Sequence, residues 1–265
     1  MASITIVIPT FDSSRTIGRC LASVKNQTSQ CEVILVDNCS RDGTIEIARR
    51  NGATVIRRAA NRSEARNIGF KQSSSVAVLF IDSDMILPPT LIEECEQALV
   101  SHDALLIPEI SIGMGYWATC KSMERRTYIG TRVLEAARCF RRERLSPLGG
   151  FDPSLEAGED WDLQQRAELA GLSFGRVDSK IIHDEGRLRL ATILKKKYFY
   201  GKTIGRYLRK NHTISIRQLN PITRIITPSL KVAVKNPSYG IGVFVIKSLE
   251  FTVAGLGHIS VSIRR

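Results

Sequence analysis

The sequence predicts an α/β protein with a mostly parallel central sheet, helices on both faces of it, and a basic amphipathic helical region at the C-terminus. Three observations lead there. Short β-branched apolar runs alternate with helix-like segments through the first half of the chain. The runs are apolar at consecutive positions, which is typical of strands buried on both faces. The third observation is that basic residues concentrate after residue 186.

The alternation sets the order of the expected elements. The strands are expected at Ile4–Ile8, Val33–Val36, Ala53–Ile56, Val76–Ile81 and Ala104–Ile107. The helices between them are expected at about Thr16–Lys25, Thr44–Arg50, Ser63–Gln72 and Thr90–Val100. With 265 residues, 43% of them hydrophobic, the chain can bury one large core or one core with an appendage. We therefore expect a sheet domain over residues 1–186 and a basic, membrane-associating helical region over 187–265.

The net charge of +12 is unevenly distributed. From Arg187 to Arg265 there are 16 lysines and arginines and one acid, Glu250, a net charge of +15. The first 186 residues carry 22 basic and 25 acidic residues, a net charge of −3. A basic tail on a near-neutral domain indicates an anionic partner, either nucleic acid or an anionic membrane.

The tail is expected to be helical and amphipathic. After Gly186, basic and apolar-aromatic residues repeat at the same helical spacing on opposed faces. The basic set is Lys195, Lys202, Arg206 and Arg209; the apolar set is Ile193, Tyr200, Ile204 and Tyr207. Ile222–Val234 is a second such segment, which Pro228 interrupts.

The last apolar segment, Tyr239–Ile263, carries Lys247, Glu250 and His258. Three ionisable groups argue against a lone membrane-spanning helix and favour one that lies in the membrane interface. The alternative is that these helices simply cover the sheet.

The compartment is predicted to be intracellular. The N-terminus enters the first apolar run without the basic and apolar regions of a signal peptide. The six cysteines form no Cys-x-x-Cys pair, so we expect mostly reduced, buried thiols.

Polar residues follow the first two strands, where ligands bind in open α/β sheets. The first strand leads into Pro9, Thr10, Phe11 and Asp12, and the second ends in Asp37-Asn38-Cys39-Ser40. An aspartate there can accept a hydrogen bond from a nucleotide base. The alternative interpretation makes Asp37 and Asp42 turn and cap residues, which we favour for Asp42 and leave open for Asp37.

Two carboxylates follow the fourth strand directly, in Asp82-Ser83-Asp84. Carboxylates this close repel each other unless a cation neutralises them, and Mg²⁺ or Mn²⁺ bound with substrate phosphates would do so. Ordinary loop acids are the alternative. His183, after a strand-like segment, is a further candidate metal ligand.

A second acid cluster, Gly158-Glu159-Asp160-Trp161-Asp162, precedes a helical segment. One of its carboxylates could take a proton from an acceptor hydroxyl, or all could cap the helix. Arg62 and Arg66 could pair with the carboxylates or with a diphosphate, or be solvated helix charges.

Taken in order, these motifs and Asn61–Gly69 and Gly149-Gly150-Phe151-Asp152 resemble the family-2 glycosyltransferases of GT-A fold, over about residues 3–186. The resemblance implies a nucleotide-diphosphate sugar donor and inversion at the anomeric carbon. It implies donor binding by a set of nine residues: Pro9, Thr10, Phe11, Asp12, Asp37, Arg66, Asp82, Ser83 and Glu159. It also implies that Asp82 and Asp84 hold Mg²⁺ or Mn²⁺, with His183 a further ligand, and that Asp160 is the base.

Two features depart from or refine the family pattern. The family commonly has Asp-Asp-Gly-Ser after the second strand, so the role of Asn38 is in doubt. The Gln-x-x-Arg-Trp motif of processive synthases is not evident around residues 187–210, which favours transfer of a single sugar. The tail is similar to that of archaeal membrane-associated members, which implies GDP-mannose over UDP sugars, a lipid-linked acceptor, and the cytoplasmic face of the membrane.

Other functional classes fit less well. A sugar-1-phosphate nucleotidyltransferase should have a glycine-rich basic loop after the first strand, where residues 9–18 offer Arg15 and Gly18. A dinucleotide oxidoreductase needs Gly-x-Gly-x-x-Gly, which is absent there. A nucleic-acid-binding protein would explain the basic tail but not the three carboxylate loops, so no nucleic-acid partner is expected.

Overall fold

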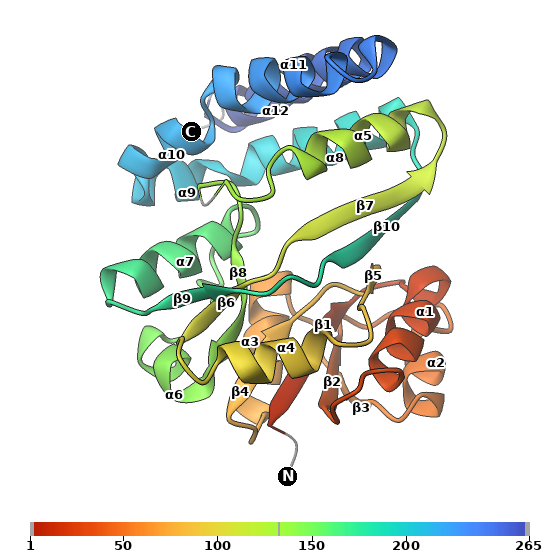
Figure 1. Ribbon diagram of the computed structural model, residues 1–265, viewed down its shortest axis with the longest axis vertical. Helices are drawn as coiled ribbons and strands as arrows, with labels where there is room; N and C mark the ends of the chain where they lie inside the picture. Colours follow the sequence, from red (N-terminus) through yellow and green to blue (C-terminus); the bar gives the residue numbers. More distant parts are fainter. Residues whose placement is uncertain (1–2, 132, 263–265) are drawn as a thin grey trace. The chain divides into compact units, whose positions relative to one another are not determined.

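The computed structural model describes residues 3–131 and 133–262 and divides the chain into two compact units (Figure 1). Unit 1 comprises Met1–Pro108, Ala136–Pro153 and Glu159–Asp184. Unit 2 comprises Glu109–Glu135, Ser154–Gly158 and Glu185–Arg265. The predicted 187–265 region thus falls within unit 2, which also draws on two earlier stretches.

Unit 1 is built on a seven-stranded sheet of order β3-β2-β1-β4-β8-β6-β9. Its strands are β1 Ile4–Thr10, β2 Glu32–Asp37, β3 Thr54–Arg57, β4 Ala77–Phe80, β6 Ala104–Leu106, β8 Ala137–Arg141 and β9 Phe174–Arg176. The pairs β3–β2, β2–β1, β1–β4 and β6–β9 are parallel, whereas β8 runs antiparallel to both β4 and β6. The sheet is therefore mostly parallel, as the sequence predicts.

Helices cover both faces of this sheet. They are α1 Ser14–Lys25, α2 Thr44–Arg50, α3 Arg62–Gln72, α4 Leu91–Ala98, α6 Arg142–Leu145, the 3₁₀ turn η1 Ser146–Leu148 and α7 Glu159–Leu169. Alternate residues of β1 point to opposite faces. Ile6 joins a core with Ile17 of α1 and Leu91 of α4, and Val7 joins another with Phe70 of α3.

The parallel strands bring their carboxyl ends to one edge. Thr10 at the end of β1 lies opposite Asp37 at the end of β2. The short strand β5 (Met85–Ile86) follows the end of β4 and pairs antiparallel with the first part of β10 (Ile181–Arg187), so that His183 lies opposite Met85. This pairing, which the sequence pattern does not predict, brings His183 beside the Asp82–Asp84 loop.

Local side-chain contacts fix helix α3 and the turn that it holds. Asn61 and Glu64 form a reciprocal capping box at its N-terminus. Further along, Asn67 pairs with the backbone of Phe151: the Phe151 N–H donates to Asn67 Oδ1 at 2.8 Å, and Asn67 Nδ2 donates to the Phe151 carbonyl at 2.7 Å. Gly150 has φ of 74°, and a Cβ there would lie 2.4 Å from Asn67 Oδ1.

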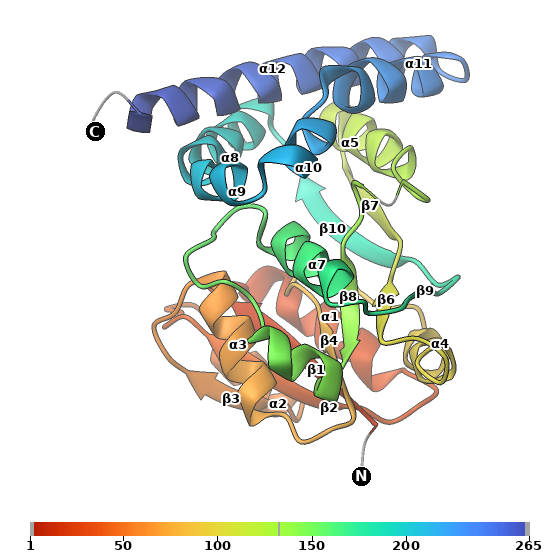
Figure 2. The same cartoon turned by 90° about the vertical axis from the view of Figure 1, so that its left-hand side faces the viewer.

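Unit 2 is mainly helical. It contains β7 Glu109–Met114, the end of β10, α5 Tyr116–Arg126, α8 Leu190–Thr203, α9 Gly205–Lys210, α10 His212–Gln218, the π-helical turn η2 Ile222–Ile226, α11 Thr227–Ala233 and α12 Pro237–Ser262. Figures 1 and 2 show α12 lying along α8, α5 and α11. Ile263, the last residue of the predicted Tyr239–Ile263 segment, and residues 264–265 of the tail lie outside the described residues.

The opposed faces predicted after Gly186 are confirmed. The basic set of this segment is exposed, while Ile193 is 7% and Tyr207 0% exposed. The apolar face therefore packs within the protein. A break between α8 and α9 at Ile204, which the periodicity does not reveal, divides the segment in two.

All six cysteines have free thiols, as expected for reduced residues. Four are buried, and Cys31 and Cys39 are half-buried. Burial, with smaller contributions from Asp84 and Asp82, raises the pKa of Cys20.

The Gly149-Gly150 turn allows a test of the packing on Asn67. Replacing Gly149, whose φ is 73° and whose Cβ would meet no atom within 4 Å, costs the left-handed backbone penalty of about 1–2 kcal/mol. Gly150→Ala adds a clash with Asn67, for which we expect a further loss of about 1–3 kcal/mol. Denaturant unfolding of the two alanine variants measures the difference. Equal losses would contradict the Asn67 contact.

Candidate active site

Arg66, on α3, is the centre of a cluster of charged side chains at the carboxyl edge of the sheet in unit 1. Its guanidinium is 0% exposed. Nη1 donates to Asp160 Oδ1 at 2.6 Å and to Glu159 Oε1 at 3.4 Å, and Nη2 donates to Asp82 Oδ1 at 2.9 Å. The Phe151 ring centroid lies 5.0 Å from Arg66 Cζ, in cation–π contact. One buried cation thus joins the loop after β4 to the first turn of α7.

The three acids in the first turn of α7 differ in their burial and in the arginines that they contact. Glu159 is buried and also accepts from Arg62 Nη1 at 3.1 Å. The Asp160 side chain is 31% exposed. Asp162 is fully buried and pairs with Arg166 Nε at 2.8 Å.

Arg166 is a structural residue that the sequence analysis did not identify. Its Nη1 donates to the Leu148 carbonyl at 2.7 Å and its Nη2 to the Gly150 carbonyl at 2.7 Å. Asp162 and Arg166 therefore hold the turn that presents Phe151 to Arg66. Their spacing of four residues on one helix is the available sequence signal.

The charges in the cluster shift the acidities of its members. Burial opposes ionisation of Asp82, but Arg66, and then Arg138 and Arg62, hold the pKa of Asp82 well below its ordinary value. Burial and then Asp160 raise the pKa of Glu159, against the two arginines. The arginines therefore keep Asp82 ionised despite its burial.

The ends of β1 and β2 are joined through Asp37. The buried Asp37 carboxylate accepts hydrogen bonds from Thr10 Oγ1 at 3.0 Å, from the Ser40 N–H at 2.8 Å and from Ser40 Oγ at 2.5 Å. Cys39, between them, has φ of 57°, so the loop turns sharply enough to return to its own aspartate. Asn38 Oδ1 accepts from the Ala60 N–H at 3.1 Å, which gives Asn38 a role in holding the loop before α3.

The loop after β1 is held from the same side. Asp12 has φ of 44°, its N–H donates to Ser40 Oγ at 2.8 Å, and its Oδ1 accepts from the Arg41 N–H at 2.9 Å. Asp42 accepts from the Ser14 N–H at 2.9 Å and the Thr44 N–H at 3.1 Å, which is the turn role that the sequence favours; the N-cap of α2 is the next residue, Gly43. The hydrogen bond from the Thr44 hydroxyl is the largest of the effects that lower the pKa of Asp42.

The predicted metal ligands lie at the β4–β5 loop and on β10. Asp84 Oδ2 and His183 Nε2 are 2.9 Å apart, and their side chains are 34% and 13% exposed. Ser83 Oγ donates to Ser13 Oγ at 2.9 Å. Within residues 3–131 and 133–262, no three His, Cys, Asp or Glu side chains are grouped so as to hold a metal by themselves. Mg²⁺ or Mn²⁺ bound with substrate phosphates needs only one or two protein carboxylates, so this donor set fits such an ion.

The predicted donor-binding residues differ in exposure. Phe11 is 60% exposed and Asp12 is also exposed, so both can contact a ligand directly. Pro9 is half-buried and Thr10 is 4% exposed. Three of the set, Asp37, Arg66 and Glu159, have almost no exposed surface. Any contribution of these three to donor binding comes through the residues that they hold.

Comparisons with known proteins agree in one family. The model described as Glycosyl transferase family 2 matches residues 5–144. The glycosyltransferase AglE of Haloferax volcanii is 28% identical over 219 residues, which are 75% of this chain and 72% of that protein. An uncharacterized glycosyltransferase of Haemophilus influenzae is 27% identical over 180 residues, 60% of each protein. The Staphylococcus aureus transferase TarP is 30% identical over 104 residues, 36% of this chain and 32% of TarP. The chain thus matches less than two thirds of the length of the last two relatives.

Solved structures share the fold. The mannosyltransferase PcManGT from Pyrobaculum calidifontis, in complex with GDP-Man and Mn²⁺, superimposes with a TM-score of 0.69 at 16% identity, over 97% of this chain and 87% of that one. TarS residues 1–349 of Staphylococcus aureus with UDP-GlcNAc gives a TM-score of 0.57 at 18% identity, over 92% and 79%. The expected GT-A type α/β fold is confirmed.

The burial of Arg66 predicts a large effect of its removal. Arg66→Gln leaves Asp82, Asp160 and Glu159 without their shared cation, and we expect a loss of about 3–5 kcal/mol in the free energy of unfolding. Arg62→Gln is the matched control. The Arg62 side chain is 38% exposed and forms an ion pair with Glu159, so a loss of about 1 kcal/mol or less is expected. Denaturant unfolding of both variants distinguishes them, and equal losses would contradict the central role of Arg66.

Proposed function

The chain belongs to glycosyltransferase family 2 and is a glycosyltransferase, and from this premise we propose that it moves a sugar from a nucleotide-diphosphate sugar to a lipid-linked or membrane-proximal acceptor, with inversion and with a divalent metal. The observation that carries the proposal is the buried Arg66 cation. It holds Asp82, at the end of β4, and Asp160, at the start of α7, on the same guanidinium. A donor-binding carboxylate and a base are thereby kept in one site.

The donor is proposed to bind at the ends of β1, β2 and β4. Phe11 and Asp12 are exposed there, and Thr10 and Asp37 hold the loops that carry them. Ser83 and Asp82 lie on the adjacent loop. Among donors we place GDP-mannose ahead of UDP sugars, because the neighbour with the higher TM-score of the two was solved with GDP-Man and Mn²⁺.

The metal is proposed to be Mg²⁺ or Mn²⁺, held by Asp82 and Asp84 with His183. Such an ion, when bound with the donor, neutralises negative charge on the diphosphate as it departs. The Asp84 and His183 side chains are both accessible, and Asp82 Oδ1 is already committed to Arg66. Arg66 keeps Asp82 ionised and oriented, which preorganises the loop for a cation.

The chemistry assigned to the protein itself is proton removal. The acceptor oxygen attacks the anomeric carbon, the bond from that carbon to the diphosphate oxygen breaks, and the nucleoside diphosphate leaves with the bonding electrons. For a hydroxyl acceptor, Asp160 takes the hydroxyl proton. Arg66 holds Asp160 through Oδ1, and the side chain stays 31% exposed to meet an acceptor.

The acceptor side of the proposal rests on the basic tail. Residues 187–265 carry a net charge of +15, and α12 is long and apolar enough to cross a membrane by length and composition. We propose that this region associates with the anionic cytoplasmic face of the membrane, where a lipid-linked acceptor is available. Transfer of single sugars remains the prediction, and no nucleic acid takes part.

The metal assignment predicts a loss that is specific to nucleotide binding. With wild-type protein, a thermal-shift panel of GDP, UDP, CDP and dTDP should identify one base that raises Tm more with Mn²⁺ than without. At a nucleotide concentration about 100 times Kd, the gain is about 2.7 kcal/mol. Asp84→Ala should abolish the Mn²⁺-dependent part of that gain. Asp178→Ala, which removes an exposed acid from unit 1, is the control and should keep it. Full transfer activity of Asp84→Ala, or of wild type in excess EDTA, would refute the metal site.

The base assignment predicts a loss of turnover without a loss of donor binding. Asp160→Asn keeps a side-chain oxygen for Arg66 but is a far weaker base, so kcat with a hydroxyl acceptor should fall about 10²–10⁴-fold. The donor Kd should stay as in wild type. Glu156→Gln, which changes a nearby exposed acid in the sequence, is the control. Wild-type turnover in Asp160→Asn would mean that the proton is not removed by this residue.

A further inference from the structure

Helix α12 of unit 2 buries Lys247 and Glu250 together with Val243 and Ile246, and it exposes several other apolar side chains. Lys247 and Glu250 are each 2% exposed. The exposed face carries Ile241, Phe244, Val245, Leu256 and Ile259, which are between 37% and 65% exposed. At 100° per residue, Glu250 lies roughly 180° around the helix from Ile241. This is the reverse of the pattern on a surface helix of a soluble protein.

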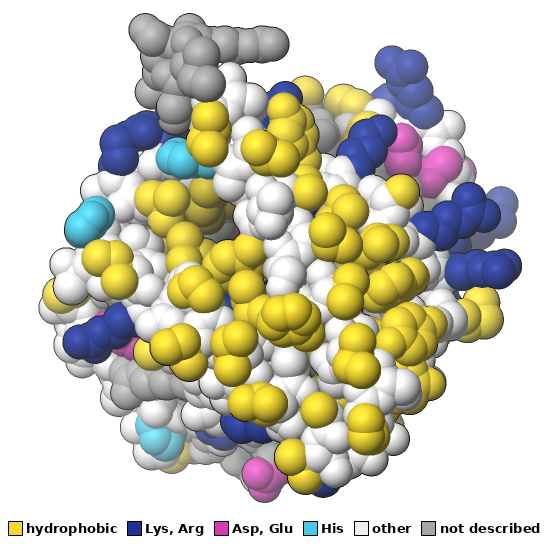
Figure 3. Space-filling model, turned by 90° about the horizontal axis from the view of Figure 1, so that it is seen from above, with side chains coloured by type: hydrophobic (Ala, Val, Ile, Leu, Met, Phe, Trp, Pro, Cys, Tyr) yellow, Lys and Arg dark blue, Asp and Glu magenta, His cyan; other side chains and the backbone are white. Residues whose placement is uncertain are grey.

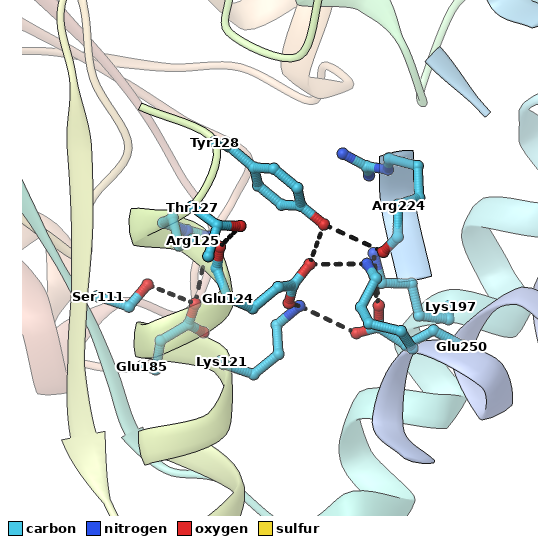
Figure 4. A network of polar contacts seen from close by, with 11 residues as sticks. Ser111, Lys121, Glu124, Arg125, Thr127, Tyr128, Glu185, Lys197, Arg224 and Glu250 are labelled. Atoms are coloured by element: carbon cyan, nitrogen blue, oxygen red, sulfur yellow. Dashed lines mark hydrogen bonds and ion pairs between the residues drawn. The ribbon is translucent and has the colours of Figure 1, made fainter. Parts of the chain in front are cut away.

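The buried charges fix which side of α12 faces the protein. Lys247 Nζ lies 2.8 Å from Glu124 Oε1 and 2.9 Å from Glu250 Oε2. Lys121 Nζ of α5 lies 2.7 Å from Glu124 Oε2 and 3.1 Å from Glu250 Oε1 (Figure 4). Tyr128 Oη donates to Glu124 Oε1 at 2.7 Å. Each glutamate of α5 and α12 thus contacts both lysines.

The electrostatics agree with a tightly paired cluster. Burial opposes ionisation of Glu124, but Lys121 and Lys247 hold the pKa of Glu124 well below its ordinary value. In the same way, against burial, Lys121, Lys197 and Lys247 lower the pKa of Glu250 to about 2. Separating α12 from α5 would leave these lysines and glutamates without their oppositely charged partners. The interior of a lipid bilayer contains no groups that could replace those partners.

Close backbone contacts hold α12 along its length. A Cβ at Gly242 would lie 2.4 Å from Tyr116 Oη of α5, and one at Gly240 would lie 2.4 Å from the Ala233 Cβ of α11. Towards the other end, a Cβ at Gly257 would lie 2.3 Å from the Tyr198 carbonyl of α8. The helix is therefore packed on three neighbours, and its apolar face is the side left to solvent.

The apolar face extends onto η2 and α11. Ile222, Ile226, Leu230 and Val234 are 63%, 42%, 61% and 85% exposed. Figure 3 shows the apolar side chains gathered over one face, with lysine and arginine side chains towards its edges. We call these nine residues the apolar face: five lie on α12, three on η2 and α11, and Val234 directly follows α11.

The charges around the apolar face select its occupant. Lys231 on α11 and Lys235 just after its end are exposed, next in sequence to Leu230 and Val234. Glu250 is the sole acid between residues 187 and 265, and it is buried, so this part of the chain presents cations without carboxylates. An anionic bilayer matches both the apolar surface and its basic margin, whereas a second copy of the same surface would bring like charges together.

We propose that the apolar face docks unit 2 on an anionic lipid bilayer with α12 lying in the membrane plane, so that a helix long enough to span the bilayer does not cross it. This deepens the membrane association proposed above and rests on it. The cluster of Lys121, Glu124, Lys247 and Glu250 determines the orientation, because it keeps the polar side of α12 on the protein.

The first test is flotation of the full chain with vesicles of phosphatidylcholine containing a quarter phosphatidylglycerol. Wild type should float and should remain partly bound at high salt, since the apolar contacts are not screened. Phe244→Glu with Leu256→Glu should lower the partition coefficient about tenfold or more for each apolar side chain withdrawn. The matched control is Val100→Glu with Leu169→Glu, at exposed apolar positions of unit 1, which should partition as wild type.

The second test measures the depth of α12. Single cysteines at Ile241, Thr252 and Ile259 carry a fluorophore, in a background where Cys31 and Cys39 are serine. In-plane docking places all three at the same shallow depth in quenching by brominated lipids. A deep position for Thr252 between two shallow ends would show a spanning helix and overturn the proposal.

Other results would also overturn the docking proposal or the proposed enzyme site. Unchanged flotation of the Phe244→Glu, Leu256→Glu variant would show that the apolar face does not meet lipid. A wild-type dimer that this variant disrupts, with no flotation, would assign the face to a second copy and overturn the proposal. The nucleotide thermal shift needs no lipid, so its loss with intact flotation refutes the proposed enzyme site, and its retention without flotation refutes the docking surface.

Discussion

The buried guanidinium of Arg66 is the interaction on which the site in unit 1 depends. A cation without exposed surface is costly unless its charge is compensated, and here three carboxylates and the Phe151 ring surround it. Two of those carboxylates belong to the first turn of α7 and one to the loop after β4. Breaking the arrangement at any point leaves a buried charge without its partner, so the two segments hold their positions together.

This constraint assigns the acids of the site to different tasks. Glu159 and Asp162 are buried and serve Arg62, Arg66 and Arg166, while Asp160 keeps exposed surface. The positive charges around Asp82 keep it ionised without a metal, so the loop is organised before any ligand arrives. A glycosyltransferase benefits from such order, because groups fixed in advance need not reorganise as charge develops on the leaving group.

In unit 2, buried ion pairs orient a helix. Lys121, Glu124, Lys247 and Glu250 neutralise one another between α5 and α12, and their directional contacts set the rotation of α12 about its axis. The same side of α12 also buries Val243 and Ile246, so the ion pairs and this apolar packing agree on one rotation and leave Phe244 and Leu256 exposed. Because the ion pairs are directional, they contribute specificity to the choice of the surface that the helix offers to its surroundings.

The sequence by itself determined the strands and helices of the first hundred residues except the two-residue strand β5, because their apolar runs and helical periods are local. It also placed polar residues such as Asp12 and Asp82 at strand ends, since those follow directly from strand limits. Only the tertiary structure decided that β8 enters antiparallel beside β4 and that Arg66 and Asp37 are buried. It also decided that, of the three acids in the first turn of α7, Asp160 alone keeps substantial exposure. Periodicity fixes the angle between residues on one element, but which side faces inward depends on partners distant in the sequence, as Glu124 is from Lys247.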